Sequence, residues 1–292
     1  MTDAMWQLFM RANDGEAGFY QTFWLAEESI GKAVEAAYAL LHAEGFSDTT
    51  IVDYDWALPA DEAIEIIPGK RYETARYKWH QEPFEPYFMM PNGIVPARSG
   101  HSYDIDDIRD ALAWTKDEDN YFVLEACIGR AQLWRRFNDA ADCFPPSARL
   151  EIVAHGHWSD DSRTLFMSCP KAWDGKDMRA FLDSELEHIV FNGHVEIAFV
   201  GDSDRSVLRL TDHKTLLCTS YDKAVVNAVG DTLMDLPIVA WQDFRNLGGG
   251  FTHVHYAWPG TPDRDGFIRR LENSGFSLRH VREENYLDAS PE

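Results

Sequence analysis

The sequence predicts an α+β fold with antiparallel-rich β-sheets and helices packed on one face, built from ββαβ-like units. Three observations support this prediction: an N-terminal strand-strand-helix-strand order, a similar order after residue 148, and a closing strand-helix-strand unit. Antiparallel sheets with helices on one face fit this order better than a doubly wound parallel sheet does.

The N-terminal unit begins with two aromatic-rich runs, residues 6–10 and 19–24, separated by a turn segment at 13–16. Ser29 is a suitable cap for a helix, because apolar residues recur at intervals of three and four from Ile30 to Leu41. Gly45 is expected to end this helix, and residues 49–54 form another β-rich run.

Between the units, residues 81–96 carry four prolines and predict an ordered loop, and residues 102–114 predict a helix that begins at Asp104, Asp106 and Asp107. The Pro145-Pro146 pair is the best candidate for a boundary between two domains.

We therefore expect an acidic α+β domain at 1–147 and a C-terminal α+β domain at 148–292. In the second domain the patterns predict strands at 150–154, 164–168, 195–200, 207–210, 215–219, 251–258 and 276–281, and helices at 176–190, 222–234 and 263–273.

The composition of the chain indicates where in a cell the protein is expected to be found. No stretch has the ~18 to 20 consecutive apolar residues of a membrane span, and the N-terminal residues do not read as a secretory signal. The cysteines, Cys127, Cys143, Cys169 and Cys218, are too widely spaced for a CxxC motif, so we expect reduced thiols and a cytoplasmic location.

Net charge is the strongest compositional signal. The chain has 27 basic and 49 acidic side chains, a formal charge of −22, and residues 1–66 hold 13 acids against 2 bases. A field of this sign repels nucleic acid and anionic membranes and attracts basic partners, although solubility alone also favours acidic surfaces.

Carboxylates surround two large aromatic side chains in the acidic N-terminal unit, and aromatic anchors ringed by acids suit the recognition of a basic protein. The alternative is core aromatics beside solvated acids. The expected partner-binding residues are Asp48, Asp53, Tyr54, Asp55, Trp56, Asp61, Glu62 and Glu65. The leading functional prediction is a non-enzymatic, bacterial-type immunity protein that neutralises a basic toxin, with a nuclease as the favoured toxin class.

Two His-x-His pairs support a different hypothesis, a metal-dependent enzyme. His155 and His157 lie in one strand-like segment, and His253 and His255 lie in another. Residues i and i+2 of a strand point to the same face, so each pair could offer two imidazoles to one ion. No companion ligand follows at a recognisable spacing, so the expectation is no bound metal, no other cofactor and no catalytic residue. A regulatory or structural oligomer is the third alternative.

Other motifs are incomplete. The acidic run from Asp104 to Asp110 lacks the glycine and glutamate of an EF-hand. The glycines at 248–250 are not followed by the Lys-Ser/Thr of a phosphate-binding loop, so they predict a turn before a strand.

Overall fold

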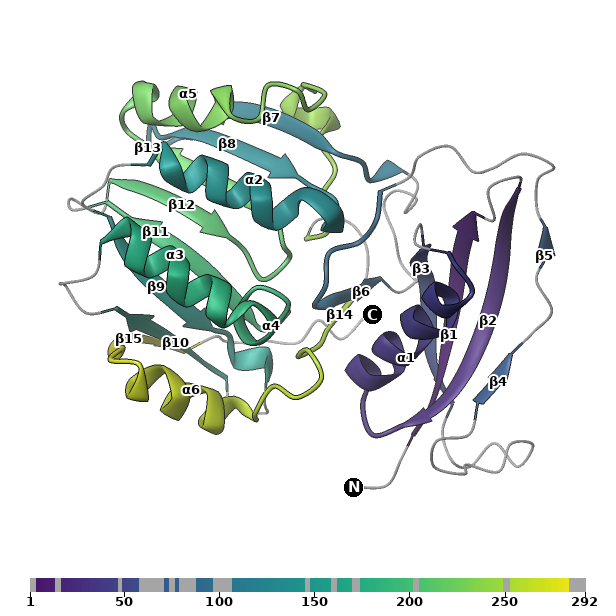
Figure 1. Ribbon diagram of the computed structural model, residues 1–292. Coiled ribbons are helices and arrows are strands. Elements are labelled where there is room, and N and C mark those ends of the chain that lie inside the picture. The colour runs from purple at the N-terminus through teal and green to yellow at the C-terminus, as the bar shows by residue number, and fades with distance from the viewer. Residues whose placement is uncertain are drawn as a thin grey trace, which may run out of the picture.

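The computed structural model shows an α+β protein in which two antiparallel sheets are joined by a short two-stranded sheet (Figure 1). The predicted fold class is thereby confirmed. The structure describes residues 4–13, 17–46, 49–57, 71–73, 77–78, 88–96, 107–144, 148–158, 162–169, 174–201, 205–248 and 253–283.

The N-terminal sheet has the predicted strand-strand-helix-strand order. It contains β1 (Ala4–Asn13), β2 (Gly18–Glu27), β3 (Thr49–Ala57) and β4 (Arg71–Glu73) in the order β3-β1-β2-β4, with β5 (Tyr77–Lys78) also paired to β2. Helix α1 (Ile30–Ala43) begins at Ser29, whose side chain accepts a hydrogen bond from the Lys32 amide at 3.3 Å. Gly45, at φ +93°, follows its last turn.

The larger sheet has the strand order β15-β10-β9-β11-β12-β13-β8-β7, and all pairs are antiparallel. Its strands are β7 (Ala111–Lys116), β8 (Phe122–Cys127), β9 (Arg149–Ala154), β10 (Arg163–Ser168), β11 (Val195–Val200), β12 (Ser206–Leu210), β13 (Leu216–Ser220) and β15 (Ser277–Glu283). The helices of this unit are α2 (Arg130–Asp142), α3 (Gly175–Ser184), α4 (Leu186–Ile189), α5 (Lys223–Asp231) and α6 (Arg264–Asn273).

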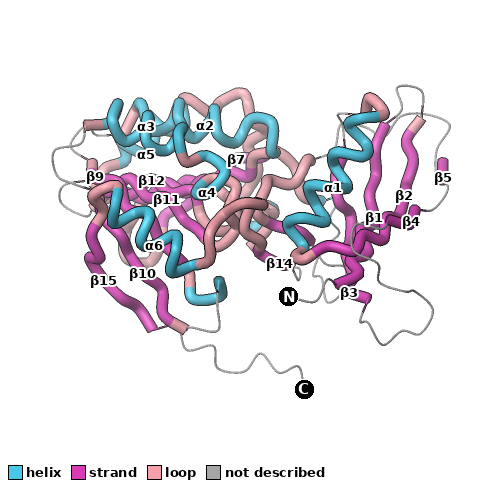
Figure 2. The backbone as a smooth tube through the Cα atoms, turned by 60° about the horizontal axis from the view of Figure 1, so that its bottom comes forward, coloured by secondary structure: helices cyan, strands magenta, loops and turns pink. Residues whose placement is uncertain are grey.

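These helices cover one face of the larger sheet, as predicted (Figure 2). Alternation along the strands explains this. Leu150, Ile152 and Ala154 of β9 join one core with apolar residues of every helix from α2 to α6. Glu151 points to the other face, where it accepts hydrogen bonds from arginine side chains. The opposite face of this sheet therefore carries charged residues.

Residues 111–116 correct one prediction. This segment is strand β7, paired with β8, whereas the sequence predicts a helix through Trp114; residues 101–106 lie outside the described range. The acidic start and the alanines favoured a helix, but Leu112 is fully buried in the core of the larger sheet. Burial on a sheet edge outweighs the weak local helix propensity.

Two further expectations need adjustment. The helix expected at 176–190 is divided at Glu185 into α3 and α4. The domain boundary expected at 147 falls on residues 145–147, which are outside the described residues. Strands β7 and β8 precede that position and nevertheless belong to the same sheet as β9, so strand grouping places residues 111–142 with the C-terminal half.

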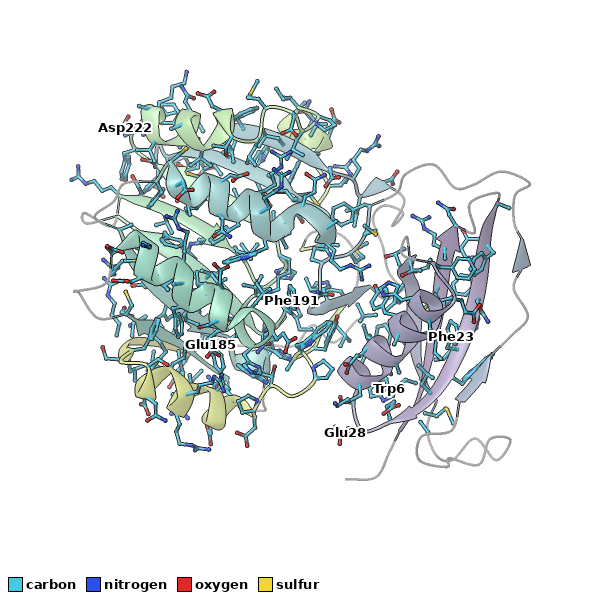
Figure 3. All side chains as sticks on the ribbon, in the orientation of Figure 1. Trp6, Phe23, Glu28, Glu185, Phe191 and Asp222 are labelled. Carbon is cyan, nitrogen blue, oxygen red and sulfur yellow. The ribbon has the colours of Figure 1, made fainter. Side chains whose placement is uncertain are left out.

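The two sheets meet at β6 (Ile94–Pro96) and β14 (His253–His255), which pair with each other. The Gly193 amide donates to the Tyr256 carbonyl at 2.9 Å, and the Tyr256 amide donates to the Gly93 carbonyl at 2.8 Å. A Cβ atom on Gly193 would lie 1.8 Å from the Gly93 carbonyl oxygen, so this contact requires glycine. Phe191, labelled in Figure 3, packs against Trp258 at this junction, with ring centroids 5.3 Å apart.

Within the part of the chain that the structure describes, no helix combines the length and the apolar character needed to cross a membrane.

Candidate metal centre

Strand β14 presents a pair of histidines to the larger sheet. Val254 and Tyr256 pack into the N-terminal core, so the alternating His253 and His255 face the other way. The Nε2 atoms of the two histidines are 3.0 Å apart. Two nitrogens bound to one tetrahedral zinc ion are separated by about 3.3 Å, given Zn–N bonds of about 2.0–2.1 Å. The second His-x-His pair is therefore in a strand and shares one face, as the sequence suggests.

The β12–β13 hairpin adds a third histidine. His213 lies in the turn, and its ring centroid is 4.7 Å from that of His253 and 5.0 Å from that of His255. Nδ1 of His213 donates to Oδ1 of Asp212 at 2.9 Å. A carboxylate that binds one imidazole nitrogen fixes the ring orientation and leaves the other nitrogen for a metal.

Donor atoms of His213, His253 and His255 all lie within 4.8 Å of one another. A metal ion placed midway between three donor atoms with this separation would be at most about 2.8 Å from each of them. A Zn–N bond is about 2.0–2.1 Å long. A shift of about 0.7 Å by each side chain would thus close the site, which is within the range of small rotamer adjustments.

The charge state of His255 suits a metal ligand. Its Nδ1 donates to the Gly193 carbonyl at 2.5 Å, which leaves Nε2 with the lone pair. Burial, followed by the neighbouring His157 ring, lowers the pKa of His255 to about 2. The imidazole is therefore neutral at physiological pH, as metal binding requires.

A second group lies beside the first. Donor atoms of His155, His157 and Asp212 also lie within 4.8 Å of one another. The His157 and His255 rings are 4.4 Å apart, so the two groups adjoin. Asp212 belongs to this second group and also bonds His213 of the first.

The local structure around His155 differs from the strand expected. Strand β9 ends at Ala154, and residues Gly156–Trp158 form a 3₁₀ turn that contains His157. The Gly156 amide donates to Oγ1 of Thr164 at 3.1 Å, which holds the start of this turn. The tight turn still brings the two rings together, with centroids 5.3 Å apart and nearly parallel planes.

His194 completes the cluster. Its ring lies 5.2 Å from His157 and 5.5 Å from the stacked ring of Trp158. Burial, and next the His157 ring, lowers the pKa of His194 to about 3, so it too is neutral. Its buried Nδ1 has no hydrogen-bond partner among the described residues.

Two charged side chains, Lys214 and Glu196, lie next to the segments that carry the cluster. Nζ of the buried Lys214 donates to the carbonyls of Asn192 at 2.6 Å and Val195 at 3.1 Å, which ties the hairpin turn to the segment carrying His194. Glu196 lies 3.9 Å from His155 and accepts a hydrogen bond from Arg209 at 2.8 Å. Burial raises the pKa of Glu196, with Arg209 opposing the shift.

Asp212 remains ionised in this setting. Burial alone would raise its pKa, but the hydrogen bond from His213 and the nearby imidazoles outweigh burial and hold the pKa well below its ordinary value. A buried carboxylate among histidines provides the negative charge that a divalent cation needs.

The predicted partner-binding residues lie elsewhere, on and after β3. Asp48, Asp61, Glu62 and Glu65 are outside the described residues. The backbones of Asp53 and Asp55 pair with those of Phe9 and Gln7 on β1, and that of Trp56 pairs with Trp6. The Tyr54 side chain packs against the N-terminal core, so it is an aromatic of that core.

Sequence reasoning found the four histidines of the two pairs but missed Asp212, His213 and His194. An Asp-His dipeptide in the turn of the predicted hairpin is a signal that could have found the first two. His194 stands alone before β11, and no local pattern singles it out. No protein-family model, curated protein or solved structure matches this chain.

Proposed function

We propose that the protein is a metal-dependent enzyme of hydrolytic type, with a zinc-class ion held by His213, His253 and His255. The observation that carries this proposal is the convergence of these histidines with the second His-x-His pair and Asp212 from separate parts of the chain. The sequence-based expectation of no metal was founded on the lack of companion ligands, and the described residues include such companions.

Three histidine ligands with a fourth position open to water are typical of catalytic zinc sites, whereas structural sites are closed by four ligands. The His213 side chain retains 30% of its exposure, so solvent reaches the centre. Zinc held in this way would supply a water nucleophile at neutral pH and would polarise a carbonyl or phosphoryl oxygen of a substrate. Asp212 orients His213, and the Gly193 carbonyl orients His255.

The position of the cluster also supports an enzymatic site. It lies where β14 joins the N-terminal core to the end of the larger sheet, and binding sites favour such junctions. All the cysteines of the chain are free thiols. This supports the proposal that the protein works in a reducing compartment such as the cytoplasm.

Metal analysis of the purified full-length protein tests the proposal. After incubation with Zn²⁺ and removal of excess ion, the wild type should retain zinc, and His253→Ala and His213→Ala should weaken zinc binding at this site by at least about 100-fold. His42→Ala, an exposed histidine on α1, is the matched control and should bind like the wild type. A wild type that holds no zinc, cobalt or manganese would refute the proposed function.

The immunity-protein hypothesis remains a second candidate. The specific observation in its favour is that β3, which carries Asp53 and Asp55, is the terminal strand of the N-terminal sheet, and terminal strands are a usual place for another chain to bind. This proposal needs a cationic protein partner and no metal, so the two candidates are separated by the same metal analysis and by a binding experiment at different salt concentrations.

A further inference from the structure

We infer that the centre is dinuclear, with a second metal ion bound by His155, His157 and Asp212 beside the ion of the proposed function. This inference rests on the proposed function, because it assigns a second site in the same cluster.

The donor geometry is the first step. The donor atoms of this second triad meet the same 4.8 Å limit as those of the first, and they come from the end of β9, the following 3₁₀ turn and the β12–β13 hairpin. Two imidazoles and one carboxylate form a ligand set that zinc accepts, and manganese and cobalt ions accept similar sets.

The relation between the triads is the second step. The His157 ring lies 4.4 Å from His255, and Asp212 bonds His213, so members of the two triads touch at two points. A single tetrahedral ion cannot use six donors, yet six are gathered here. In two-metal hydrolytic sites the ions are about 3.5–4 Å apart, so such a centre requires two ligand sets that adjoin each other, as these triads do.

Charge balance is the third step. The first triad consists of three histidines and so contributes no negatively charged ligand, whereas two dications would add four positive charges to the cluster. The second triad includes the Asp212 carboxyl group, and a carboxyl oxygen of Glu196 lies 3.9 Å from Nε2 of His155, so two acidic side chains lie on the side of the second triad. This favours a cation there, because buried charges need opposite charge nearby.

An orienting shell is also present around the second triad. Glu196 is fixed by Arg209 at 2.8 Å, and the His155 amide donates to the His194 carbonyl at 3.0 Å. Carboxylates that hydrogen-bond ligating histidines change metal affinity by about 10–100-fold when removed, and Glu196, at 3.9 Å from Nε2 of His155, lies just beyond hydrogen-bond distance in this structure.

Metal stoichiometry tests the inference. The full-length protein is loaded with Zn²⁺, desalted and analysed for zinc per chain, in parallel with His157→Gln, His253→Ala and the control His42→Ala. The wild type and the control should hold two ions, and His157→Gln should hold one. Glutamine approximates the size of histidine, and circular dichroism of each variant establishes that it is folded. His155→Asn serves as a second probe of the same site.

Loading with Mn²⁺ gives an independent readout. Two manganese ions at such a spacing are magnetically coupled, so the wild type should show the electron paramagnetic resonance signature of a pair and His157→Gln that of an isolated ion. One zinc per chain in the wild type, unchanged in His157→Gln, would overturn the dinuclear inference and leave the proposed function standing. No zinc, cobalt or manganese in the wild type would overturn both, and two ions retained by both folded His157→Gln and His155→Asn would overturn the ligand assignment.

Discussion

Asp212 is the residue on which the chemistry of the cluster depends most. It accepts a hydrogen bond from His213, and its carboxylate also lies within 4.8 Å of donor atoms of His155 and His157, so one carboxylate adjoins both triads. Asp212→Asn keeps the size of the side chain but removes its charge. We expect loss of the second ion and a roughly 10–100-fold weaker first site, because asparagine no longer holds the His213 ring as strongly. Zinc titration of this variant measures both effects.

Glu125 permits a test of a partly buried charge away from the cluster. Burial raises the pKa of this β8 carboxyl, and a 2.6 Å hydrogen bond from Asn246 opposes the shift. The folded state therefore binds the proton more tightly than the unfolded state, so this group favours folding at acidic pH and that contribution is lost as pH rises through the raised pKa.

Glu125→Gln should consequently stabilise the protein at neutral pH, since glutamine can still accept a hydrogen bond from Asn246 without a partly buried charge. The gain should disappear at a pH below the ordinary glutamate pKa. Urea denaturation at pH 7 and at acidic pH measures the difference. A variant that is less stable than the wild type at pH 7 would show that the ionised carboxylate is needed for the Asn246 contact.

At the level of elements, local pattern determined what the sequence could predict. The N-terminal hairpin, α1, the β12–β13 hairpin and α6 are confirmed because their apolar periodicity and caps agree with their burial. The helix prediction for residues 111–116 was wrong, because the burial of Leu112 depends on pairing with a strand that the local sequence does not reveal. The same limit applies to the site: each His-x-His pair is visible in sequence, but their convergence depends on where β14 docks.

The docking of β14 can itself be tested with a glycine pair. Gly193→Ala places a Cβ 1.8 Å from the Gly93 carbonyl oxygen, so β14 and β6 must separate from the start of β11. We expect a loss of at least about 1–3 kcal/mol of unfolding free energy, the usual range for overpacking, together with weaker zinc binding. Gly175→Ala is the matched control, because no atom lies within 4 Å of its added Cβ. It should be neutral or raise stability by up to about 1 kcal/mol.

Urea denaturation and zinc titration of both variants provide the measurements. If Gly193→Ala is as stable as Gly175→Ala and binds zinc normally, the close contact between the two glycines does not position the histidines of β14.

At the scale of the whole molecule, the charge of −22 makes a separate prediction for the second candidate function. If a cationic protein partner is recovered from the native host, its association should slow as salt rises, because exposed charges are screened over about 8 Å at physiological ionic strength. Neutralising Asp61, Glu62 and Glu65 should slow association more than it speeds dissociation. Binding kinetics at two salt concentrations measure this, and indifference to all three substitutions would leave solubility as the role of the charge.

The metal centre should also couple the two sheets thermodynamically. Val254 and Tyr256 of the β14 segment belong to the N-terminal core, while His253 and His255 face ligands on the larger sheet, so a bound ion restrains both units through one strand. Zinc at 100 times its dissociation constant stabilises a folded protein by about 2.7 kcal/mol, and at about 2–4 °C per kcal/mol this raises the melting temperature by about 5–10 °C. Hydrogen exchange should slow in α1 and β6 as well as in β9 and β12.

A chelator should reverse both the rise in melting temperature and the slower exchange. His253→Ala should abolish both effects, while His42→Ala should retain them. Protection confined to β9 and β12 would show that zinc binds without engaging β14, and the triad of His213, His253 and His255 would then not be the site.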